Sequence, residues 1–307
     1  MSAAPRQIDV PARLAETVRA MAGEQGAAWL GALPTTVAEH LASWDLTLER
    51  VCLPGGRISL VCYVHRDDLT PAVLKTGLVT PGTAQEHAAL AHWAGRGAVF
   101  PFAADPAAGV LLLERLYGDI PLRSLAEAKA MLEATSLLSR LWVPPGEDHP
   151  FPLVADHVTE LVAGLRRRRA LPGAADAGPV IDEALEAAAA LLADEPERLL
   201  LHGDFHHGNV LAADRAPWLA ISPEPLVGER AYDLARLAQD RLDTLVGSPG
   251  PRGAARRRLH QLADAVEVDH TRLRGWTLFR AVEAGLRSLE AGDPTTAELH
   301  LEFASWL

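Results

Sequence analysis

Lysine is the scarcest charged residue in this chain of 307 amino acids, occurring only at Lys75 and Lys129. Positive charge as a whole is in deficit, because 40 acidic side chains outnumber 29 basic ones and give a formal net charge of −11. A nucleic-acid-binding surface needs a concentrated basic patch. The charge balance therefore argues against a nucleic-acid partner, and it makes each lysine a candidate functional group.

Cysteine and long apolar runs are also scarce. The two cysteines, Cys52 and Cys62, lie in apolar segments with a strand-like pattern, which favours two reduced thiols. A disulfide between them is the alternative. No apolar run reaches the length that spans a membrane, and the first residues contain no apolar core of a secretory signal. We expect a cytoplasmic protein without a membrane partner.

The first part of the chain changes from a helical to an alternating pattern. Apolar residues between 27 and 44 follow a period of about 3.6, after breaks at Gly23 and Gly26. A helix is expected at 80–96, with a capping box formed by Thr83 and Glu86. Strands are expected at about 46–53, 58–64, 71–76, 99–102 and 110–114. Together they predict a five-stranded antiparallel sheet with one inserted helix.

Helical patterns dominate from residue 117 onward. Helices are expected at 121–142, 154–169, 180–193, 229–245, 254–266 and 271–291, and a short helix closes the chain. A chain of this length can bury a large core in two lobes. Because the strands are concentrated near the N-terminus, we expect an α+β fold with lobes at 1–116 and 117–307.

The densest group of chemically capable side chains lies between Leu199 and Glu224. Apolar triplets on each side of residues 202–209, HGDFHHGN, predict two short buried strands that hold a polar loop. Its three histidines and one aspartate suggest a zinc or iron site, and hence a metal-dependent hydrolase. However, His206 and His207 are adjacent and would point in different directions in regular structure. This interpretation is kept only as an alternative.

The spacing of Asp204 and Asn209 supports a different interpretation. Asp-x-x-x-x-Asn is the catalytic-loop arrangement of kinases, in which the aspartate orients the attacking hydroxyl and the asparagine offers an oxygen to Mg²⁺. Such a site needs a glycine turn, a strand lysine and a helix glutamate upstream. The chain has all three, in order, at residues 54–59, Lys75 and Glu86. Because a buried lysine is costly unless paired, we predict a Lys75–Glu86 ion pair.

A family resemblance is carried by HGDFHHGNVL at 202–211, by the strand ending in Val73-Leu74-Lys75, and by the order of the elements. These features resemble the aminoglycoside phosphotransferase family over nearly the whole chain. Residues 218–237, WLAISPEPLVGERAYDLARL, are most similar to the branch with streptomycin 6-phosphotransferases and hydroxyurea kinases. The resemblance implies a protein-kinase-like bilobal fold, ATP and Mg²⁺ as cofactors, and antibiotic resistance through phosphorylation of a small-molecule hydroxyl.

The resemblance also implies roles for individual residues. Asp204 matches the catalytic base and Asn209 a metal ligand, while Lys75 and Glu86 match the phosphate-binding lysine and its partner. The other matched residues are Gly55, Gly56 and Ser59 in the nucleotide-binding turn, Glu114 and Leu116 in the adenine-binding hinge, and His202 and Asp233 as structural supports. Residues 1–116 would thus bind the nucleotide, and 117–307 would carry the catalytic loop and the acceptor site.

Ser222 departs from the family pattern, which has an aspartate there as the principal Mg²⁺ ligand. A neutral hydroxyl is a weaker ligand for this cation than a carboxylate. Three readings stay open: Glu224 supplies the missing carboxylate, the metal is held mainly by ATP phosphates with slow turnover, or the chain is a pseudokinase-like binding protein. The choice matters, because loss of one charge-stabilising group commonly costs about 100-fold in rate.

The acceptor is expected to be a cationic small molecule, since a streptomycin-like acceptor carries guanidinium groups that bind carboxylates. Candidate carboxylates on the helices after the loop are Asp240, Asp243, Glu283 and Glu290. Each alone is more typical of a solvated helix face, and Trp276 and Phe279 are more typical of a core. The oligomeric state is expected to be monomer or homodimer.

Overall fold

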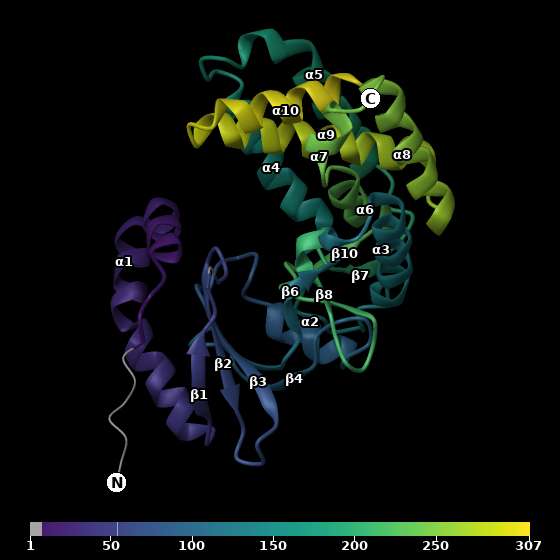
Figure 1. Ribbon diagram of the computed structural model, residues 1–307. Coiled ribbons are helices and arrows are strands. Elements are labelled where there is room, and N and C mark those ends of the chain that lie inside the picture. The colour runs from purple at the N-terminus through teal and green to yellow at the C-terminus, as the bar shows by residue number, and fades with distance from the viewer. Residues whose placement is uncertain (1–7, 54) are drawn as a thin grey trace. The chain divides into compact units, whose positions relative to one another are not determined.

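The computed structural model describes residues 8–53 and 55–307, and the chain divides into two compact units (Figure 1). The first unit contains the residues up to Tyr117 together with Ala213–Pro217, and the second contains Gly118–Ala212 and Trp218–Leu307. The expected boundary after residue 116 lies one residue before this division. The return of Ala213–Pro217 to the first unit was not anticipated from the sequence.

A five-stranded antiparallel sheet forms the centre of the first unit, in the order β1-β2-β3-β5-β4, and confirms the sequence prediction. Its strands are β1 (Thr47–Val51), β2 (Ser59–His65), β3 (Pro71–Gly77), β4 (Pro101–Asp105) and β5 (Val110–Glu114). Alternate residues of β2 and β3, including Leu60, Cys62 and Leu74, are buried on one face. The period-2 pattern therefore gave these strands correctly.

Helix α1 (Ala12–Ser43) covers the buried face of this sheet (Figure 1). Its kink lies at Gly23, where φ is 51°, as the sequence predicts. The second break, expected at Gly26, is wrong, because Gly26 lies buried inside the helix. A side chain there would place its Cβ 2.5 Å from the carbonyl oxygen of Val18. This glycine permits a close approach rather than ending a helix.

Helix α2 (Glu86–Trp93) begins later than predicted, and the expected capping box is wrong. Gln85 precedes the helix without a side-chain cap bond. The Thr83 hydroxyl instead donates to the carbonyl of Leu78 at 2.9 Å. Because Glu86 is the first helical residue and caps nothing, its carboxylate is left for Lys75.

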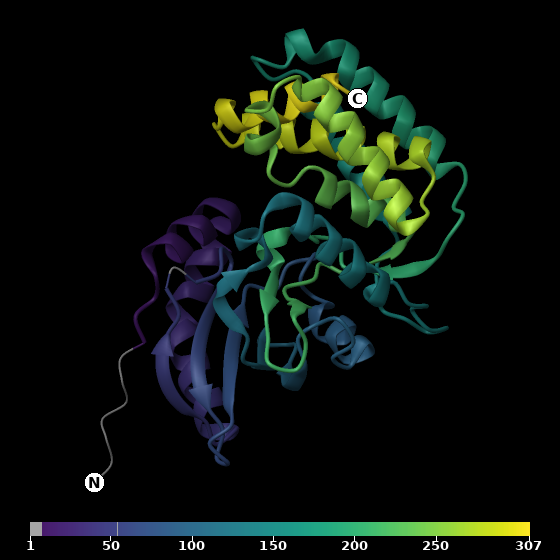
Figure 2. The same ribbon diagram turned by 45° about the vertical axis from the view of Figure 1, so that its right-hand side comes forward.

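The second unit is mainly helical, and α9 lies at its centre between α5, α6 and α10 (Figure 2). Trp276 and Phe279 on α9 are buried, so both belong to the core, as expected. The helix predicted at 229–245 is divided after Ala238, because Arg241 adopts a φ of 56°. The helices are α3 (Glu127–Leu141), α4 (Val154–Arg168), α5 (Gly178–Leu192), α6 (Arg230–Ala238), α7 (Leu242–Val246), α8 (Pro251–Val266), α9 (His270–Glu290) and α10 (Pro294–Ser305).

Short strands frame the polar loop that the sequence singled out. The loop lies between β7 (Leu199–Leu201) and β8 (Val210–Ala212), which confirms the two flanking strands. Strand β7 pairs with β10 (Leu226–Gly228), and β8 pairs with β9 (Trp218–Ala220). Strand β6 (Tyr117–Pro121) extends the second sheet to β6-β8-β9. It was missed because it is exposed and polar, without an alternating apolar pattern.

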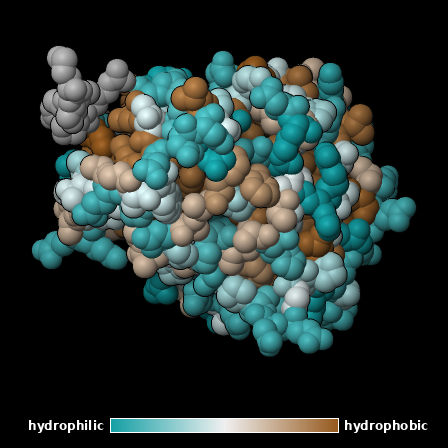
Figure 3. Space-filling view, turned by 90° about the horizontal axis from the view of Figure 1, so that it is seen from below, coloured by the Kyte–Doolittle hydropathy of each residue, from teal (hydrophilic) through white to brown (hydrophobic). Residues whose placement is uncertain are grey.

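The described residues include both cysteines and several exposed apolar side chains. None of the described helices is long and apolar enough to cross a bilayer. Cys52 and Cys62 are both free thiols, and burial raises the pKa of Cys62 to about 12. Large apolar side chains are exposed at Leu53, Leu69 and Leu132, and on the face in Figure 3 hydrophobic residues are interspersed with hydrophilic ones. Scattered exposed apolar residues are normal and indicate no docking surface.

Candidate active site

The polar loop, residues 202–209, is held at its start by the buried carboxylate of Asp233 on α6. One oxygen accepts a hydrogen bond from the backbone N–H of His202 at 2.8 Å and from the indole Nε1–H of Trp142 at 3.1 Å. The other accepts from the N–H of Gly203 at 2.7 Å. A fully buried carboxylate needs such donors to offset its desolvation. Asp233 therefore fixes the backbone immediately before Asp204.

Gly203 has a conformation and a neighbour that exclude other residues. Its φ is 79°, in the left-handed region that favours glycine. A Cβ at this position would lie 1.8 Å from the carbonyl oxygen of Glu224. The N–H of Glu224 donates in turn to the carbonyl of His202 at 2.9 Å. The loop and the segment around Glu224 are therefore packed backbone against backbone.

The carboxylate of Asp204 is oriented by two side chains of the same unit. Its Oδ1 accepts from Nε of Arg236 at 2.9 Å, and its Oδ2 accepts from Nδ2 of Asn209 at 3.1 Å. Burial raises the pKa of Asp204, but the His206 hydrogen bond and the charge of Arg236 outweigh that effect and hold the pKa well below its usual range. Asp204 is therefore an ionised acceptor with a fixed orientation.

The three histidines of the loop have separate partners. His202 is buried, its Nε2 lies 3.0 Å from the carbonyl of Ile221, and burial lowers its pKa, so the ring is a neutral donor to that carbonyl. His206 accepts from the N–H of Gly208 through Nδ1, and its Nε2 lies 3.6 Å from Oδ2 of Asp204. His207 pairs through Nδ1 with Asp240. Among the described residues no group of three His, Cys, Asp or Glu is arranged to hold a metal ion, so the geometry does not support the hydrolase alternative.

Asp240, a candidate for acceptor binding, is committed to the loop instead. Its Oδ2 accepts from the backbone N–H of His207 at 2.8 Å and lies 2.5 Å from the ring Nδ1 of the same residue. Burial opposes ionisation of Asp240, yet the bonds to His207 hold its pKa well below the usual range. The carboxylate is thus an ionised anchor for His207, and its bonding capacity is used within the protein.

The other three acceptor candidates pair with, or lie close to, arginines. Glu283 lies 3.7 Å from Arg168, and Glu290 lies 2.6 Å from the same guanidinium. Asp243 is exposed and 3.9 Å from Arg123. Two of these carboxylates therefore share one arginine, and the third is a solvated side chain.

The candidate metal ligands lie on adjacent strand ends. Pairing of Val210 with Ala220 continues into a hydrogen bond from the N–H of Ile221 to the carbonyl of Asn209 at 2.9 Å, and Ser222 follows directly. Because the amide nitrogen of Asn209 donates to Asp204, its amide oxygen is the atom that remains for a cation. Ser222 adopts a φ of 55°. The oxygen chemistry of this pair suits Mg²⁺, but neither side chain is charged.

Glu224 supplies the nearest additional carboxylate on the same segment. It is exposed, and both neighbouring prolines, Pro223 and Pro225, are buried. Partial loss of solvent around its carboxyl raises its pKa, and the negative charge of Asp204 acts in the same direction. Two mutually repelling carboxylates are stabilised by a cation between or beside them. The residues present thus fit a divalent cation with Asn209, Ser222 and Glu224 as the donor set.

The first unit contains the predicted lysine–glutamate pair. Nζ of Lys75 on β3 lies 2.6 Å from Oε1 of Glu86, and the two side chains are only 12% and 7% exposed. Breaking such a pair would leave one uncompensated buried charge, at a cost of about 3–5 kcal/mol. The pair therefore fixes the lysine ammonium at one place above β3.

The glycine turn before β2 brings backbone close to Ser59. Gly55 has a φ of 72°, and a Cβ on Gly56 would lie 2.3 Å from Oγ of Ser59. Pro54, which opens the predicted turn, lies outside the described residues. Gly56 therefore allows the Ser59 hydroxyl to lie against the main chain of the turn.

Glu114, in the predicted hinge, is held by a residue that the sequence did not reveal. Arg215 donates to both carboxylate oxygens of Glu114 and also to the carbonyls of Gly95 and Ala98, both at 2.6 Å. Glu114 also accepts from the N–H of Phe100. Leu116 is buried nearby in sequence. The side chain of Glu114 is thus saturated by protein donors, and its backbone N–H donates to the carbonyl of Phe100 at 2.9 Å.

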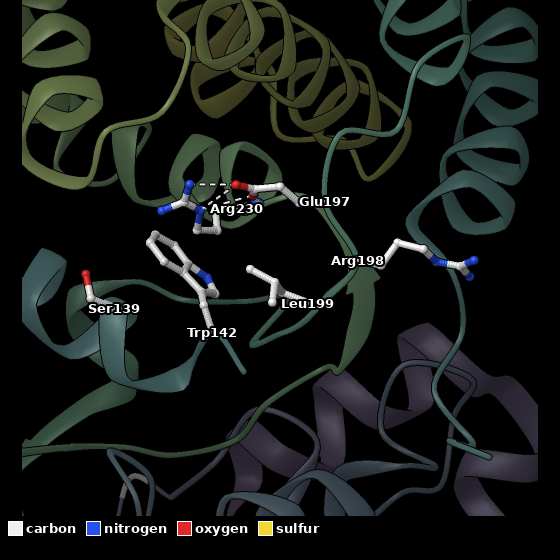
Figure 4. A pocket seen from close by; sticks show the side chains of 6 residues that line it. All are labelled: Ser139, Trp142, Glu197, Arg198, Leu199 and Arg230. Atoms are coloured by element: carbon white, nitrogen blue, oxygen red, sulfur yellow. Dashed lines mark hydrogen bonds and ion pairs between the residues drawn. The ribbon is translucent and has the colours of Figure 1, made fainter. Parts of the chain in front are cut away.

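Figure 4 shows a pocket of about 490 Å³ in the second unit, and none of the predicted site residues is among its lining residues. Its lining residues are Ser139, Trp142, Glu197, Arg198, Leu199 and Arg230. Arg230 and Glu197 form an ion pair at 2.6 Å across it. Because these charges satisfy each other, we assign no ligand to the pocket. Its relation to the loop is structural, through the bond from Trp142 to Asp233.

Comparison with known proteins gives consistent relatives over most of the chain. The family model for aminoglycoside/hydroxyurea antibiotic resistance kinases matches residues 43–292. A streptomycin 6-kinase of Streptomyces glaucescens is 36% identical over 95% of this chain and 96% of its own length. A hydroxyurea phosphotransferase of Kitasatospora aureofaciens is 36% identical over 98% of this chain and 86% of its own length.

Solved structures give the fold. Aminoglycoside phosphotransferase APH(4)-Ia, as a thermostable mutant in ternary complex with ADP and hygromycin B, superimposes with a TM-score of 0.60 at 15% identity, over 87% of this chain and 96% of that chain. Choline kinase LicA from Streptococcus pneumoniae gives a TM-score of 0.62 at 13% identity, over 90% and 99%. The expected protein-kinase-like α+β fold is confirmed.

Proposed function

Because the chain belongs to the family of aminoglycoside and hydroxyurea antibiotic resistance kinases, we propose that it transfers a phosphoryl group from ATP to a hydroxyl of a small-molecule antibiotic. A streptomycin-like aminocyclitol is the first candidate acceptor, since relatives named streptomycin 6-kinase match over nearly their full length. The geometric observation that carries the proposal is the ionised Asp204, oriented by Asn209 and Arg236.

The proposed reaction is an in-line displacement at the γ-phosphorus of ATP. A bond forms between the acceptor oxygen and phosphorus, the bond from phosphorus to the ADP oxygen breaks, and the hydroxyl proton is released, so that the products are the phosphorylated acceptor, ADP and one proton. Because the pKa of Asp204 is low, it is a weak base. Its task is to orient the hydroxyl and receive the proton late, as suits a loose phosphoryl-transfer transition state.

The remaining residues are proposed to hold the nucleotide. Lys75, fixed by Glu86, places its ammonium on the phosphates, and the Gly55–Ser59 turn supports them from the main chain. The backbone of Glu114 and Leu116 is proposed to bond adenine. Mg²⁺ would neutralise phosphate charge, with Asn209, Ser222 and Glu224 as its protein donors. The cytoplasmic location and the monomeric or homodimeric state stay predictions.

The proposal is tested by a phosphotransfer assay on the full chain. Purified protein is incubated with ATP and Mg²⁺ or Mn²⁺, and streptomycin, hydroxyurea and related aminocyclitols are examined by mass spectrometry for a phosphorylated product. We expect product from at least one acceptor. Asp204→Asn should lower kcat by about 100-fold or more, whereas Asp148→Asn, at an exposed aspartate, should match the wild type. Binding of ATP without product from any acceptor would favour the pseudokinase-like alternative and would overturn the proposal that the protein is an enzyme.

A further inference from the structure

Helix α6 and the turn after it hold the polar loop through three charged residues. Asp233 and Arg236 are three positions apart on α6 and lie on the same side of the helix, and Asp240 follows in the turn after it. Asp233 binds the backbone at His202 and Gly203, and Asp240 binds His207. Arg236, between them, is the member of the set that binds the functional carboxylate.

This division of contacts separates two tasks. The backbone of the loop is held at both ends by the two aspartates, without any contribution from Arg236. Among the described residues, the arginine has as its hydrogen-bond partner the carboxylate of Asp204, which accepts from Nε at 2.9 Å. Its removal therefore leaves the anchors of the loop in place and changes the orientation and charge environment of one side chain. Such an arrangement is what a positioning residue requires, as distinct from a residue that stabilises the fold.

The rest of the Arg236 guanidinium is available to a ligand. The side chain is 29% exposed, and within the described part of the chain only Nε has a hydrogen-bond partner, Oδ1 of Asp204. The two terminal nitrogens thus keep their donors beside Oδ1 of Asp204. A planar guanidinium matches phosphoryl and carboxylate oxygens well. Its permanent charge also lies close enough to act on Glu224.

We propose that Arg236 is a positioning residue for phosphoryl transfer, which orients Asp204 and supplies a fixed positive charge beside the reacting oxygens. This inference rests on the proposed function. The inference also bears on the metal site, in which Ser222 is neutral. We infer that the guanidinium of Arg236 supplies part of the positive charge that a metal ion bound by a carboxylate would bring to the transition state. Fixed charges that need no reorganisation are effective in this role.

The experiment measures kcat, both KM values and ATP affinity by calorimetry for the wild type, Arg236→Ala and Arg236→Lys. We expect Arg236→Ala to lower kcat by about 100-fold, while ATP affinity and melting temperature stay near those of the wild type. Arg236→Lys should recover only part of kcat, since an ammonium has the charge but not the planar fork. Added ethylguanidinium should raise kcat of Arg236→Ala. Arg169→Ala, which removes a remote pair with Asp182, is the control.

A double mutant separates positioning from a merely structural role. If Arg236 acts largely through Asp204, then Asp204→Asn combined with Arg236→Ala should lose much less in kcat than the product of the two single losses, because the two losses are not additive. Additive losses would overturn the inference. A loss of kcat that accompanies a lower melting temperature, and that ethylguanidinium does not rescue, would also overturn it. So would an unchanged kcat in Arg236→Ala. A wild type that phosphorylates no acceptor would instead overturn the proposed function itself.

Discussion

Ser222 is the residue on which the charge of the proposed metal site depends. It adopts a φ of 55°, in the left-handed region that is costly for most side chains but comparatively open to Asn and Asp. The backbone at this position is therefore already shaped for an aspartate, although the chain carries a serine. This compatibility makes a substitution at Ser222 a test of chemistry rather than of folding.

Ser222→Asp is expected to raise kcat by about 10-fold or more and to lower the Mg²⁺ concentration at half-maximal rate, because it restores an anionic oxygen ligand. The measurement is kcat at graded Mg²⁺ with saturating ATP. Ser222→Asn is the matched control, since it has the same shape and backbone tolerance without the charge. If the aspartate and asparagine variants behave alike, the neutral serine is not what limits the metal site.

At the scale of elements, the turn between β8 and β9 is bound to the rest of the first unit mainly through the side chain of Arg215. Arg215 lies in Ala213–Pro217, which belongs to that unit, and it binds Glu114, Gly95 and Ala98 there. Tyr117 also donates to Asp214 of the same turn at 2.6 Å. The turn thus fixes the end of β5, where the adenine-binding backbone is proposed.

Arg215→Ala is expected to weaken ATP binding by about tenfold with little change in kcat. The substitution removes the charge-assisted hydrogen bonds to Glu114, and such bonds contribute roughly 1.5–3 kcal/mol of stabilisation. Calorimetric titration with ATP and the KM for ATP both report this change. Arg96→Ala, at an exposed arginine of the same unit, should be silent. A fall in kcat at unchanged ATP affinity would contradict a role in the nucleotide site.

The elements that sequence patterns predicted are those with local signals. Alternation gave β2 and β3, and the 3.6-residue period gave α4 and α9. Exposed β6 has no apolar face, so it left no trace. The division of α6 from α7 depends on one residue, Arg241, whose positive φ could not be predicted from its residue type.

At the scale of the whole molecule, the resemblance stated from the sequence is confirmed by the family match and the near-full-length relatives. The pairing of Asp204 with Asn209 could be predicted from the sequence because the two residues are five positions apart. The contacts of Arg236 and Arg215 were not, because their partners lie 32 and 101 positions away. The bond between Asp240 and His207 was missed for the same reason, since the two residues are 33 positions apart. The available signal was the pair of charged residues Asp233 and Arg236 on the otherwise buried helix α6.

Stability against acid is a further property of the whole chain, and two partly buried imidazoles of the second unit contribute to it, beside the buried His202. Burial lowers the pKa of His157 and of His300 from 6.5 to about 4, and nearby arginines, including Arg287, act in the same direction. The unfolded chain therefore binds these protons more tightly than the folded chain. The stability that the neutral rings provide is complete above pH 6.5 and is lost as the pH falls towards 4.

We expect the free energy of unfolding to decrease between pH 6.5 and 4.5, with a contribution of at most about 3 kcal/mol from each histidine. Urea unfolding at several pH values measures this slope. His157→Gln and His300→Gln, which cannot be protonated, should each flatten it even if they lower stability at pH 7. The carboxylates of Asp204 and Asp240 do not confuse the test, because their pKa values are also depressed and their protonation begins below this window. A slope that both variants leave intact would mean that neither imidazole governs the loss of stability in acid.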